Sequence, residues 1–290
     1  MTTNAQMLAA YDSQLRLVVP LAPPLGQEFH SDGFLLRVTG RGRGFVETAQ
    51  TLNVVGDALD LLINTHRDFF AASGESVEWK TRAHDVPADI PRRLLRAGFV
   101  PEDVEVVMVG NVQSMVIDSL VPRDVGIRIV HAPKDLNLIA ELESEVWGEN
   151  FGWIAKDLHS KITADPGNVV ILVAEAGGRV VSAAWLVFTD GTDFAGLWGG
   201  STLVQWRGQG IYRALVARRV QIARDRGVKY LQVDASDKSA PILARLGFIA
   251  ITTTTPYVWT PPRDEHPAAG LAPDAVRRTI GLESEREPLG

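Results

Sequence analysis

The sequence predicts an α/β protein that is organised in two halves. Segments with the apolar spacing of strands alternate with segments of helical spacing along most of the chain. The pattern stops at Val121-Pro122-Arg123-Asp124 and then begins again. Each half also contains a short predicted helix with a similar ending, Leu95-Arg96-Ala97-Gly98-Phe99 and Ala244-Arg245-Leu246-Gly247-Phe248, which suggests a duplication. The predicted divisions are a partial domain at 1–121, a complete domain at 122–262 and a tail at 263–290.

The first half contains three predicted helices and three predicted strands. The longest helix has Leu52, Val55, Leu59 and Leu62 at helical spacing, and Gly74 follows its end. A glycine-rich turn at residues 40–44 precedes it. The predicted helices cover 5–17, 51–72 and 89–97, and the predicted strands cover 33–39, 76–81 and 104–109.

The second half is richer in strands. Gly177-Gly178 predicts a hairpin turn, residues 190–193 predict a second turn, and Gly227 and Gly247 follow two predicted helices. The predicted strands cover 126–130, 168–174, 180–188, 194–204, 229–233 and 249–259. The predicted helices cover 135–147, 153–162, 211–226 and 239–246.

Composition narrows the function classes. The 290 residues carry a net charge of −6 and no cysteine. An acidic chain argues against nucleic acid as the main partner, and the lack of cysteine excludes disulfides, thiolate metal sites and a cysteine nucleophile. We find neither a signal peptide in residues 1–16 nor an apolar run long enough to span a membrane. We therefore expect a cytoplasmic protein without a membrane partner.

The turn between Val204 and Tyr212 carries the strongest chemical signal. A predicted strand ends, Gly208 and Gly210 follow two residues apart, and a helix begins at once. A helix N-terminus offers unpaired N–H groups and a positive dipole end, which suits a phosphate or pyrophosphate. A dinucleotide-binding turn would need a third glycine where Arg213 stands, and a Walker loop would need Gly-Lys followed by Ser or Thr.

The segment Gln205-Trp206-Arg207-Gly208-Gln209-Gly210 resembles the Q/R-x-x-G-x-G/A signature of the GCN-five-related N-acetyltransferases, the GNAT family. The order of predicted elements over residues 126–259 resembles that family too. The resemblance implies an α+β mixed sheet, splayed open between its fourth and fifth strands, with acyl-CoA in the cleft. It implies an acyltransferase that moves an acyl group other than an amino-acyl group, by default acetyl, from acetyl-CoA to a primary amine. The whole chain resembles tandem acetyltransferases of the mycothiol synthase type, with two GNAT-like domains of which the first is partial.

The resemblance also assigns residues to an acetyl-CoA site. Backbone groups at the end of the fourth strand would bind the pantetheine arm, and N–H groups of the turn would hold the pyrophosphate. Gly199-Gly200 falls near the family's bulge in the fourth strand, where an N–H polarises the thioester carbonyl. Asp237 falls where the family often has an asparagine beside the CoA arm. The implied cofactor-binding residues are Thr202, Leu203, Val204, Arg207, Gly208, Gln209, Gly210, Ile211, Tyr212 and Asp237.

Two departures from the family pattern stand out. Many members have a tyrosine four residues before the glycine of Leu-Gly-Phe, which is proposed to protonate the leaving thiolate, and here that position is Leu243. Tyr212 and Tyr257 are the nearby tyrosines in the sequence. In the first half, Arg41-Gly42-Arg43-Gly44 resembles the turn, but no full signature precedes the long helix. The first half is therefore expected to be a degenerate copy.

Direct attack of an amine on a thioester in a ternary complex calls for a base. The candidate catalytic residues are Asp193, at the head of the fourth strand, and Glu145, on the first helix of the second half, with Asp234 as a third. Each also has an ordinary interpretation as a turn residue or a solvated residue. Trp147 and Trp153 flank a loop that often covers the acceptor in this family, so we expect them to contact the substrate. No cluster has metal-ligand spacing, so no metal is expected.

The acceptor is not specified by the sequence. A small-molecule amine or a peptide amine would fit, and the protein would be a monomer or a homodimer. Three other functions stay open: a non-catalytic CoA-binding or regulatory protein, motivated by Leu243; an aminoacyl-tRNA-dependent transferase with paired domains of this fold; and RNA binding through residues 40–44. The intact turn at 205–210 argues against the second, and the acidic net charge argues against the third.

Overall fold

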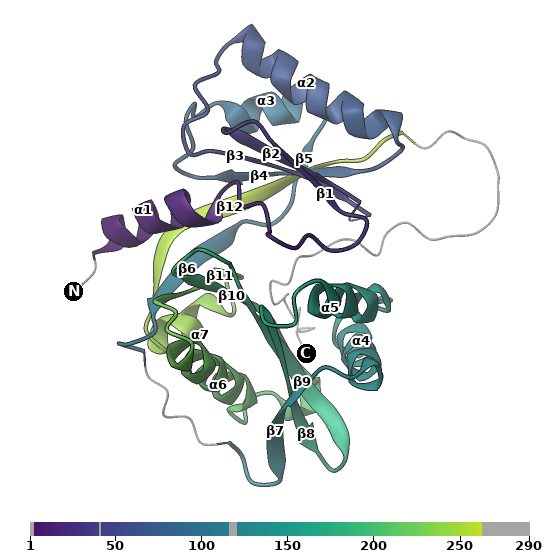
Figure 1. Ribbon diagram of the computed structural model, residues 1–290, viewed down its shortest axis with the longest axis vertical. Helices are drawn as coiled ribbons and strands as arrows, with labels where there is room; N and C mark the ends of the chain where they lie inside the picture. Colours follow the sequence, from purple (N-terminus) through teal and green to yellow (C-terminus); the bar gives the residue numbers. More distant parts are fainter. Residues whose placement is uncertain (1–2, 41, 116–120, 263–290) are drawn as a thin grey trace, which may run out of the picture. The chain divides into compact units, whose positions relative to one another are not determined.

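The computed structural model describes residues 3–40, 42–115 and 121–262, which form two compact units (Figure 1). Unit 1 joins Met1–Val107 to a segment that begins at Ile251, and unit 2 is Met108–Ala250. Both divisions fall inside strands, namely β6 (Glu105–Asn111) and β12 (Phe248–Trp259). This division differs from the predicted one at residues 121 and 122, because strand pairing and not the linker decides which unit each end joins. The predicted tail at 263–290 lies outside the described residues.

Unit 1 is a mixed sheet with helices. Its strand order is β1-β2-β3-β4-β12, in which β3 and β4 are parallel and the other neighbours are antiparallel. The short strand β5 pairs with β12 outside this path. The strands are β1 (Glu28–Ser31), β2 (Leu35–Thr39), β3 (Gly44–Thr48), β4 (Val77–Arg82) and β5 (Val100–Pro101), and the helices are α1 (Asn4–Leu15), α2 (Asp57–Ala72) and α3 (Ile90–Arg96).

The core of unit 1 lies where α2 meets the sheet. Leu59, Ile63 and Phe70 of α2 share one fully buried cluster with Val46 and Trp79 from the strands. Leu59, Ile63 and Phe70 are four and seven residues apart, which is the spacing of one helix face, whereas Leu52 and Val55 of the predicted pattern precede the helix.

The long helix begins six residues later than predicted. Thr51 forms an isolated bridge with Val86, and Asn53 and Gly56 have positive φ angles of 53° and 61°, so residues before Asp57 cannot continue the helix. The glycine-rich turn at 40–44 joins β2 to β3, an antiparallel hairpin that the sequence analysis missed. That turn does not precede a helix, so its expected likeness to the phosphate-binding turn is wrong.

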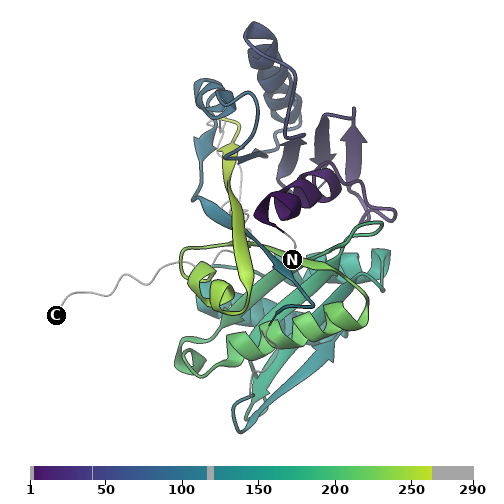
Figure 2. The same cartoon turned by 90° about the vertical axis from the view of Figure 1, so that its left-hand side faces the viewer.

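Unit 2 contains a larger mixed sheet with helices on both faces (Figure 1). Its strand order is β6-β11-β10-β9-β8-β7, and β10 and β11 are parallel. Helices α4 and α5 lie on one face and α6 on the other (Figure 1), and Figure 2 shows α6 running in front of the strands. The strands are β7 (Val125–Val130), β8 (Val169–Ala176), β9 (Arg179–Phe188), β10 (Phe194–Thr202) and β11 (Tyr230–Ala235), and the helices are α4 (Pro133–Trp147), α5 (Trp153–Ala164), α6 (Ile211–Asp225) and α7 (Ala240–Arg245).

The centre of this sheet is covered on both faces. Residues 180–186 of β9 are all buried, and so are residues 170–174 of β8. Such strands read as continuous apolar runs because both faces meet helices. The predicted α/β class with a mixed sheet is confirmed. No helix in the part of the chain that the structure describes is long and apolar enough to cross a membrane.

The sheet of unit 2 opens between β10 and β11. The two strands pair only where Phe194–Gly196 face Tyr230–Gln232. Beyond Gly196 they have no pairing in common, so residues 197–202 and 233–235 diverge. Further along β10, the register against β9 shifts between Gly199 and Ser201, which marks a β-bulge. This opening positions the site described next.

Candidate active site

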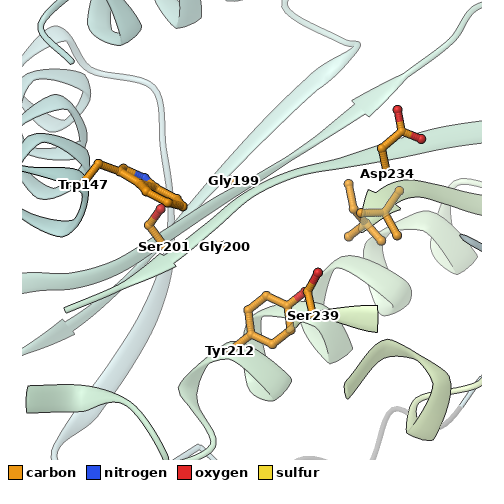
Figure 3. Close-up of a pocket in the computed structure, with 9 residues that line it drawn as sticks. Trp147, Gly199, Gly200, Ser201, Tyr212, Asp234 and Ser239 are labelled. Carbon is orange, nitrogen blue, oxygen red and sulfur yellow. The ribbon is translucent and has the colours of Figure 1, made fainter. Parts of the chain in front are cut away.

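A depression lies in the opening between β10 and β11 (Figure 3). Figure 3 shows Trp147 and Ser201 close together on one side of the depression, with Tyr212 and Ser239 on the other and Asp234 beyond them. Every lining residue belongs to unit 2. The lining residues are Trp147, Leu197, Gly199, Gly200, Ser201, Tyr212, Val233, Asp234 and Ser239.

Two glycines form the bulge in the wall of the depression. Gly199 and Gly200 have φ angles of 66° and 109°, which disfavour other residues. A Cβ on Gly199 would lie 2.6 Å from the Trp185 ring, and one on Gly200 would lie 2.8 Å from the Tyr212 ring. Gly200 has no register partner in β9, so its N–H is outside that ladder. A backbone N–H in this position can polarise a carbonyl that enters the depression.

The glycine turn follows β10 directly. The 3-10 helix η1 (Val204–Trp206) leads into Gly208 and Gly210, whose φ angles are 73° and 87°, and α6 begins at Ile211. A Cβ on either glycine would meet nothing within 4 Å. The first turn of α6 contains no acidic residue, and its first N–H groups have no acceptor inside the helix. The turn therefore offers open space, free donors and a positive dipole end to an anion.

The structure groups most of the predicted CoA-binding residues along one continuous stretch. Thr202 and Leu203 are buried at the end of β10, and Arg207 donates its Nε hydrogen bond to the Thr202 carbonyl. Tyr212 is the member of the set that lines the depression itself. Asp237 is exposed after β11 and is not among the lining residues, whereas Ser239, two residues later, is.

Glu143 on α4 is the residue that the sequence analysis missed. Its side chain is fully buried, and its Oε2 atom accepts hydrogen bonds from Ser201 Oγ at 2.5 Å and Trp147 Nε1 at 2.9 Å. Its Oε1 atom is buried without a hydrogen-bond partner. Both donors line the depression, so Glu143 lies directly behind its wall.

Burial controls the ionisation of Glu143. Loss of solvent raises its pKa to about 7, and the hydrogen bonds from Ser201 and Trp147 oppose that rise only in part. A signal for this residue was present in the sequence. Leu136, Ile139, Ala140 and Glu143 lie three or four residues apart, so Glu143 is a carboxylate on the apolar stripe of its helix.

Two of the three predicted bases lie elsewhere. Glu145, two residues further along α4, is about half exposed and forms an ion pair with Arg179. Asp193 stands at the opposite end of β10, eight residues before Ser201, which at about 3.3 Å per residue is roughly 25 Å away. Asp234 does line the depression, where its Oδ1 accepts a hydrogen bond from Gln232 at 2.7 Å. The structure therefore brings Asp234 to the site, but neither Glu145 nor Asp193.

Of the two tryptophans that were predicted to contact the substrate, one lies at the depression and the other does not. Trp147 lines the depression and is held by Glu143. Trp153 is 41% exposed, its ring lies 6.1 Å from that of Phe151, and it is not a lining residue. Within the described residues, no group of three or more His, Asp or Glu side chains could hold a metal ion.

Tyr212 supplies a hydroxyl on the α6 side of the depression. Leu243, where the family often has its tyrosine, is a buried apolar residue of α7. Burial raises the pKa of Tyr212, and the charge of Arg219 partly opposes that rise. Arg219 is itself fully buried on α6, where it donates to the carbonyls of Trp185 and Trp198 at 3.3 and 3.1 Å.

Comparison with known proteins gives one sequence match. Residues 136–248 match the model of the acetyltransferase (GNAT) family. No curated protein matches the chain.

Solved structures share the fold over most of the chain. A GCN5-related N-acetyltransferase from Kribbella flavida aligns with a TM-score of 0.65 and 15% identity, covering 91% of this chain and 97% of that chain. A tandem GNAT protein from the clavulanic acid biosynthesis pathway aligns with a TM-score of 0.61 and 12% identity, covering 91% and 98%. A GCN5-related N-acetyltransferase from Sphaerobacter thermophilus aligns at 0.59 and 16%, covering 78% and 80%. Sequence match, strand opening, bulge and turn coincide in unit 2, and the chain carries an acetyltransferase (GNAT) family domain at residues 136–248.

Proposed function

We propose that this protein is an acetyl-CoA-dependent N-acetyltransferase that acylates a primary amine by direct attack in a ternary complex. The observation that carries the proposal is the opening between β10 and β11, which has a bulge in its wall and leads along the chain into an open glycine turn. The amine is that of a small molecule or a peptide.

The cofactor would follow the path of the chain from the turn to the bulge. N–H groups of residues 207–212 would hold the pyrophosphate at the start of α6. Backbone groups of residues 202–204 would bind the pantetheine arm. The acyl carbonyl would then reach Gly200, whose N–H lies outside the ladder with β9.

The chemistry requires one bond to form and one to break. The amine nitrogen attacks the thioester carbon, the new C–N bond forms, and the C–S bond breaks as CoA leaves with the electron pair. The Gly200 N–H would stabilise the negative charge that develops on the carbonyl oxygen. Since the chain has no cysteine, the acyl group cannot pass through a cysteinyl intermediate.

Unit 1 would be a degenerate second copy that binds no CoA. Its long helix α2 begins after Gly56, but its first turn carries Asp57 and Asp60. Asp60 is paired with Arg93 at 2.6 Å, but the Asp57 carboxylate repels a pyrophosphate from the very position that the dipole would otherwise favour. The carbonyl of Gly56 also accepts a hydrogen bond from Arg93.

A non-catalytic CoA-binding or regulatory protein is the alternative, and it rests on Leu243. Tyr212 weakens that argument, because it brings another hydroxyl to the same depression. Behind the opposite wall, the burial of the Glu143 carboxylate is unfavourable in free energy, which is unusual for a domain that only binds CoA.

Calorimetric titration of acetyl-CoA tests the proposal, and the chain provides a matched pair of variants. Gly208 and Gly227 both have a φ of 73°, and a Cβ on either would meet nothing within 4 Å. Gly208→Ala and Gly227→Ala therefore carry the same backbone strain of about 1 kcal/mol at opposite ends of α6.

We expect micromolar binding by the wild type and by Gly227→Ala, and at least tenfold weaker binding by Gly208→Ala. An amine library, with release of free CoA thiol as the readout, then tests transfer. Failure of the wild type to bind millimolar acetyl-CoA would refute the proposed function. Binding without transfer to any amine would favour the regulatory alternative.

A further inference from the structure

The pair Ser201 and Glu143 forms a connected path from the depression into the protein. Ser201 lines the depression, and its hydroxyl donates to Glu143 Oε2 at 2.5 Å. Because that proton points at Glu143, the lone pairs of Ser201 Oγ remain able to accept a hydrogen bond. Ser201 follows Gly200 directly along β10, and Gly200 is the residue whose N–H would polarise the acyl carbonyl.

Glu143 is held in an arrangement that suits its ionised form. Two donors converge on Oε2, as expected for a carboxylate, which accepts hydrogen bonds and donates none. The Oε1 atom has no partner and is buried. Ser182 completes the support, since its hydroxyl lies 2.7 Å from the Ser201 carbonyl and fixes the strand behind the pair. A buried carboxylate with one unpaired oxygen is costly, and such a group needs a reason.

We propose that Ser201 and Glu143 form a proton relay for the acceptor amine, an inference that rests on the proposed function. Ser201 is the catalytic residue, because its Oγ would accept the hydrogen bond of the amine N–H. Glu143 acts through Ser201 and receives the proton. As the amine nitrogen bonds to the thioester carbon, its proton passes to Ser201 Oγ, while the Ser201 proton passes to Glu143 Oε2. The C–S bond breaks with its electrons on sulfur, the CoA thiolate takes a proton from water, and Glu143 returns its own proton to water.

The surroundings of Glu143 support this role. Burial raises its pKa to about 7, so near neutral pH both its forms are populated and it is a stronger base than an exposed glutamate. The groups shown to face it are neutral: Trp147 from its own helix and Ser201 from β10. The adjacent helix α5 buries apolar residues, Ile154 and Leu158. Among the described residues, no charged side chain is a cause of the shift.

The test is the pH dependence of kcat at saturating alkylamine, whose own ionisation lies near pH 10. The variants are Glu143→Gln and Ser201→Ala, and Glu145→Gln is the control on the same helix. We expect the wild type and the control to show a limb that rises through about pH 7. In Glu143→Gln and in Ser201→Ala that limb should be absent. At pH 8 the kcat of each variant should be about 100-fold lower than that of the wild type, with acetyl-CoA affinity unchanged.

Combining the two changes separates a relay from a structural role. When two residues act as one unit, the effects of their substitutions on kcat do not add. The double variant Glu143→Gln/Ser201→Ala should therefore be no slower than either single variant. If the wild type transfers acetyl groups but Glu143→Gln or Ser201→Ala keeps the limb, the relay is wrong and the proposed function stands. If the wild type neither binds acetyl-CoA nor transfers acetyl groups, the proposed function itself has failed. Ser201→Ala leaves the buried carboxylate in place, so it still tests the relay if Glu143→Gln does not fold.

Discussion

The ionisation of Glu143 should be measurable in the stability of the protein, independently of any substrate. Its pKa is raised from 4.5 to about 7 in the folded state. The folded protein therefore keeps this proton up to a higher pH than the unfolded chain does. The contribution of Glu143 to the free energy of unfolding therefore falls as the pH rises from about 4.5 to about 7, and it is constant above that range.

The size of the effect follows from the same shift. At 1.36 kcal/mol per pKa unit, ionised Glu143 costs about 3 kcal/mol above pH 7. About 2 kcal/mol of this cost develops between pH 5 and pH 8. Glu143→Gln removes the titration but keeps the shape, so its stability relative to the wild type should improve by about 2 kcal/mol between those two pH values. Any loss from altered hydrogen bonds is common to both pH values and cancels in the comparison.

Urea unfolding followed by circular dichroism at pH 5 and pH 8 provides the assay. Glu145→Gln is the control, because its half-exposed carboxylate pairs with Arg179 at the surface and should change stability by less than about 1 kcal/mol at either pH. If Glu143→Gln differs from the wild type by the same amount at pH 5 and pH 8, burial does not perturb Glu143, and the argument from its pKa is refuted.

Three further predictions concern other parts of the chain. Tyr212→Phe keeps the ring beside Gly200 but removes the hydroxyl, so kcat should fall at least tenfold while calorimetry shows unchanged acetyl-CoA affinity; an unchanged kcat would exclude a role for the hydroxyl. Calorimetry should give one acetyl-CoA per chain, because the Asp57 carboxylate opposes a pyrophosphate at the start of α2 in unit 1, and a stoichiometry of two would contradict this. Burial lowers the pKa of His66 to about 4, so the unfolded chain binds its proton first, and the contribution of His66 to stability is lost as the pH drops from 6.5 towards 4, opposite in sign to the contribution of Glu143. In urea unfolding, the stability of His66→Gln relative to the wild type should therefore rise as the pH drops through this range, and a constant difference would show that His66 does not titrate there.

Much of the fold was predictable because most of its helices and strands are marked by patterns within their own sequence. Strand alternation, helical spacing and glycine ends placed all seven α-helices of the described residues within a few positions, the start of α2 apart. The start of α2 and the strand β3 were missed together. The five residues of β3, from Gly44 to Thr48, are too short to show alternation between a turn and a helix. What makes them a strand is pairing with β2 and β4, and such pairing between distant segments leaves no mark in a short stretch of sequence.

In the candidate site, too, the residues that are contiguous in the chain were predicted, and those that depend on distant segments were not. The turn at 205–210 was predictable because its glycines and the helix behind it are contiguous. Glu143 was not predicted, because its role depends on β10, a strand some 58 residues away in the chain. Glu145 and Glu143 differ only in the helix face they occupy. The apolar stripe of α4 distinguishes them, because a carboxylate on such a stripe is expected to be buried and one on the solvated face is not.

The stretch of β10 at the bulge lies between two titratable side chains, one on each side of the sheet. Neighbouring residues of a strand face opposite sides of the sheet. Ser201 contacts Glu143 of α4 on one side, whereas a Cβ on Gly200 would meet Tyr212 of α6 on the other. The sheet thus separates the Glu143 carboxylate from the Tyr212 hydroxyl. The charge of Arg219 lowers the pKa of Tyr212 but does not contribute to the raised pKa of Glu143. In the proposed relay the α4 side takes the proton of the amine, and the Tyr212→Phe variant tests whether the α6 side, in place of water, gives a proton to the thiolate. A leucine at position 243 is then compatible with the proposed transfer, because Tyr212 of α6 brings a hydroxyl to the depression, where the family often has a tyrosine on α7.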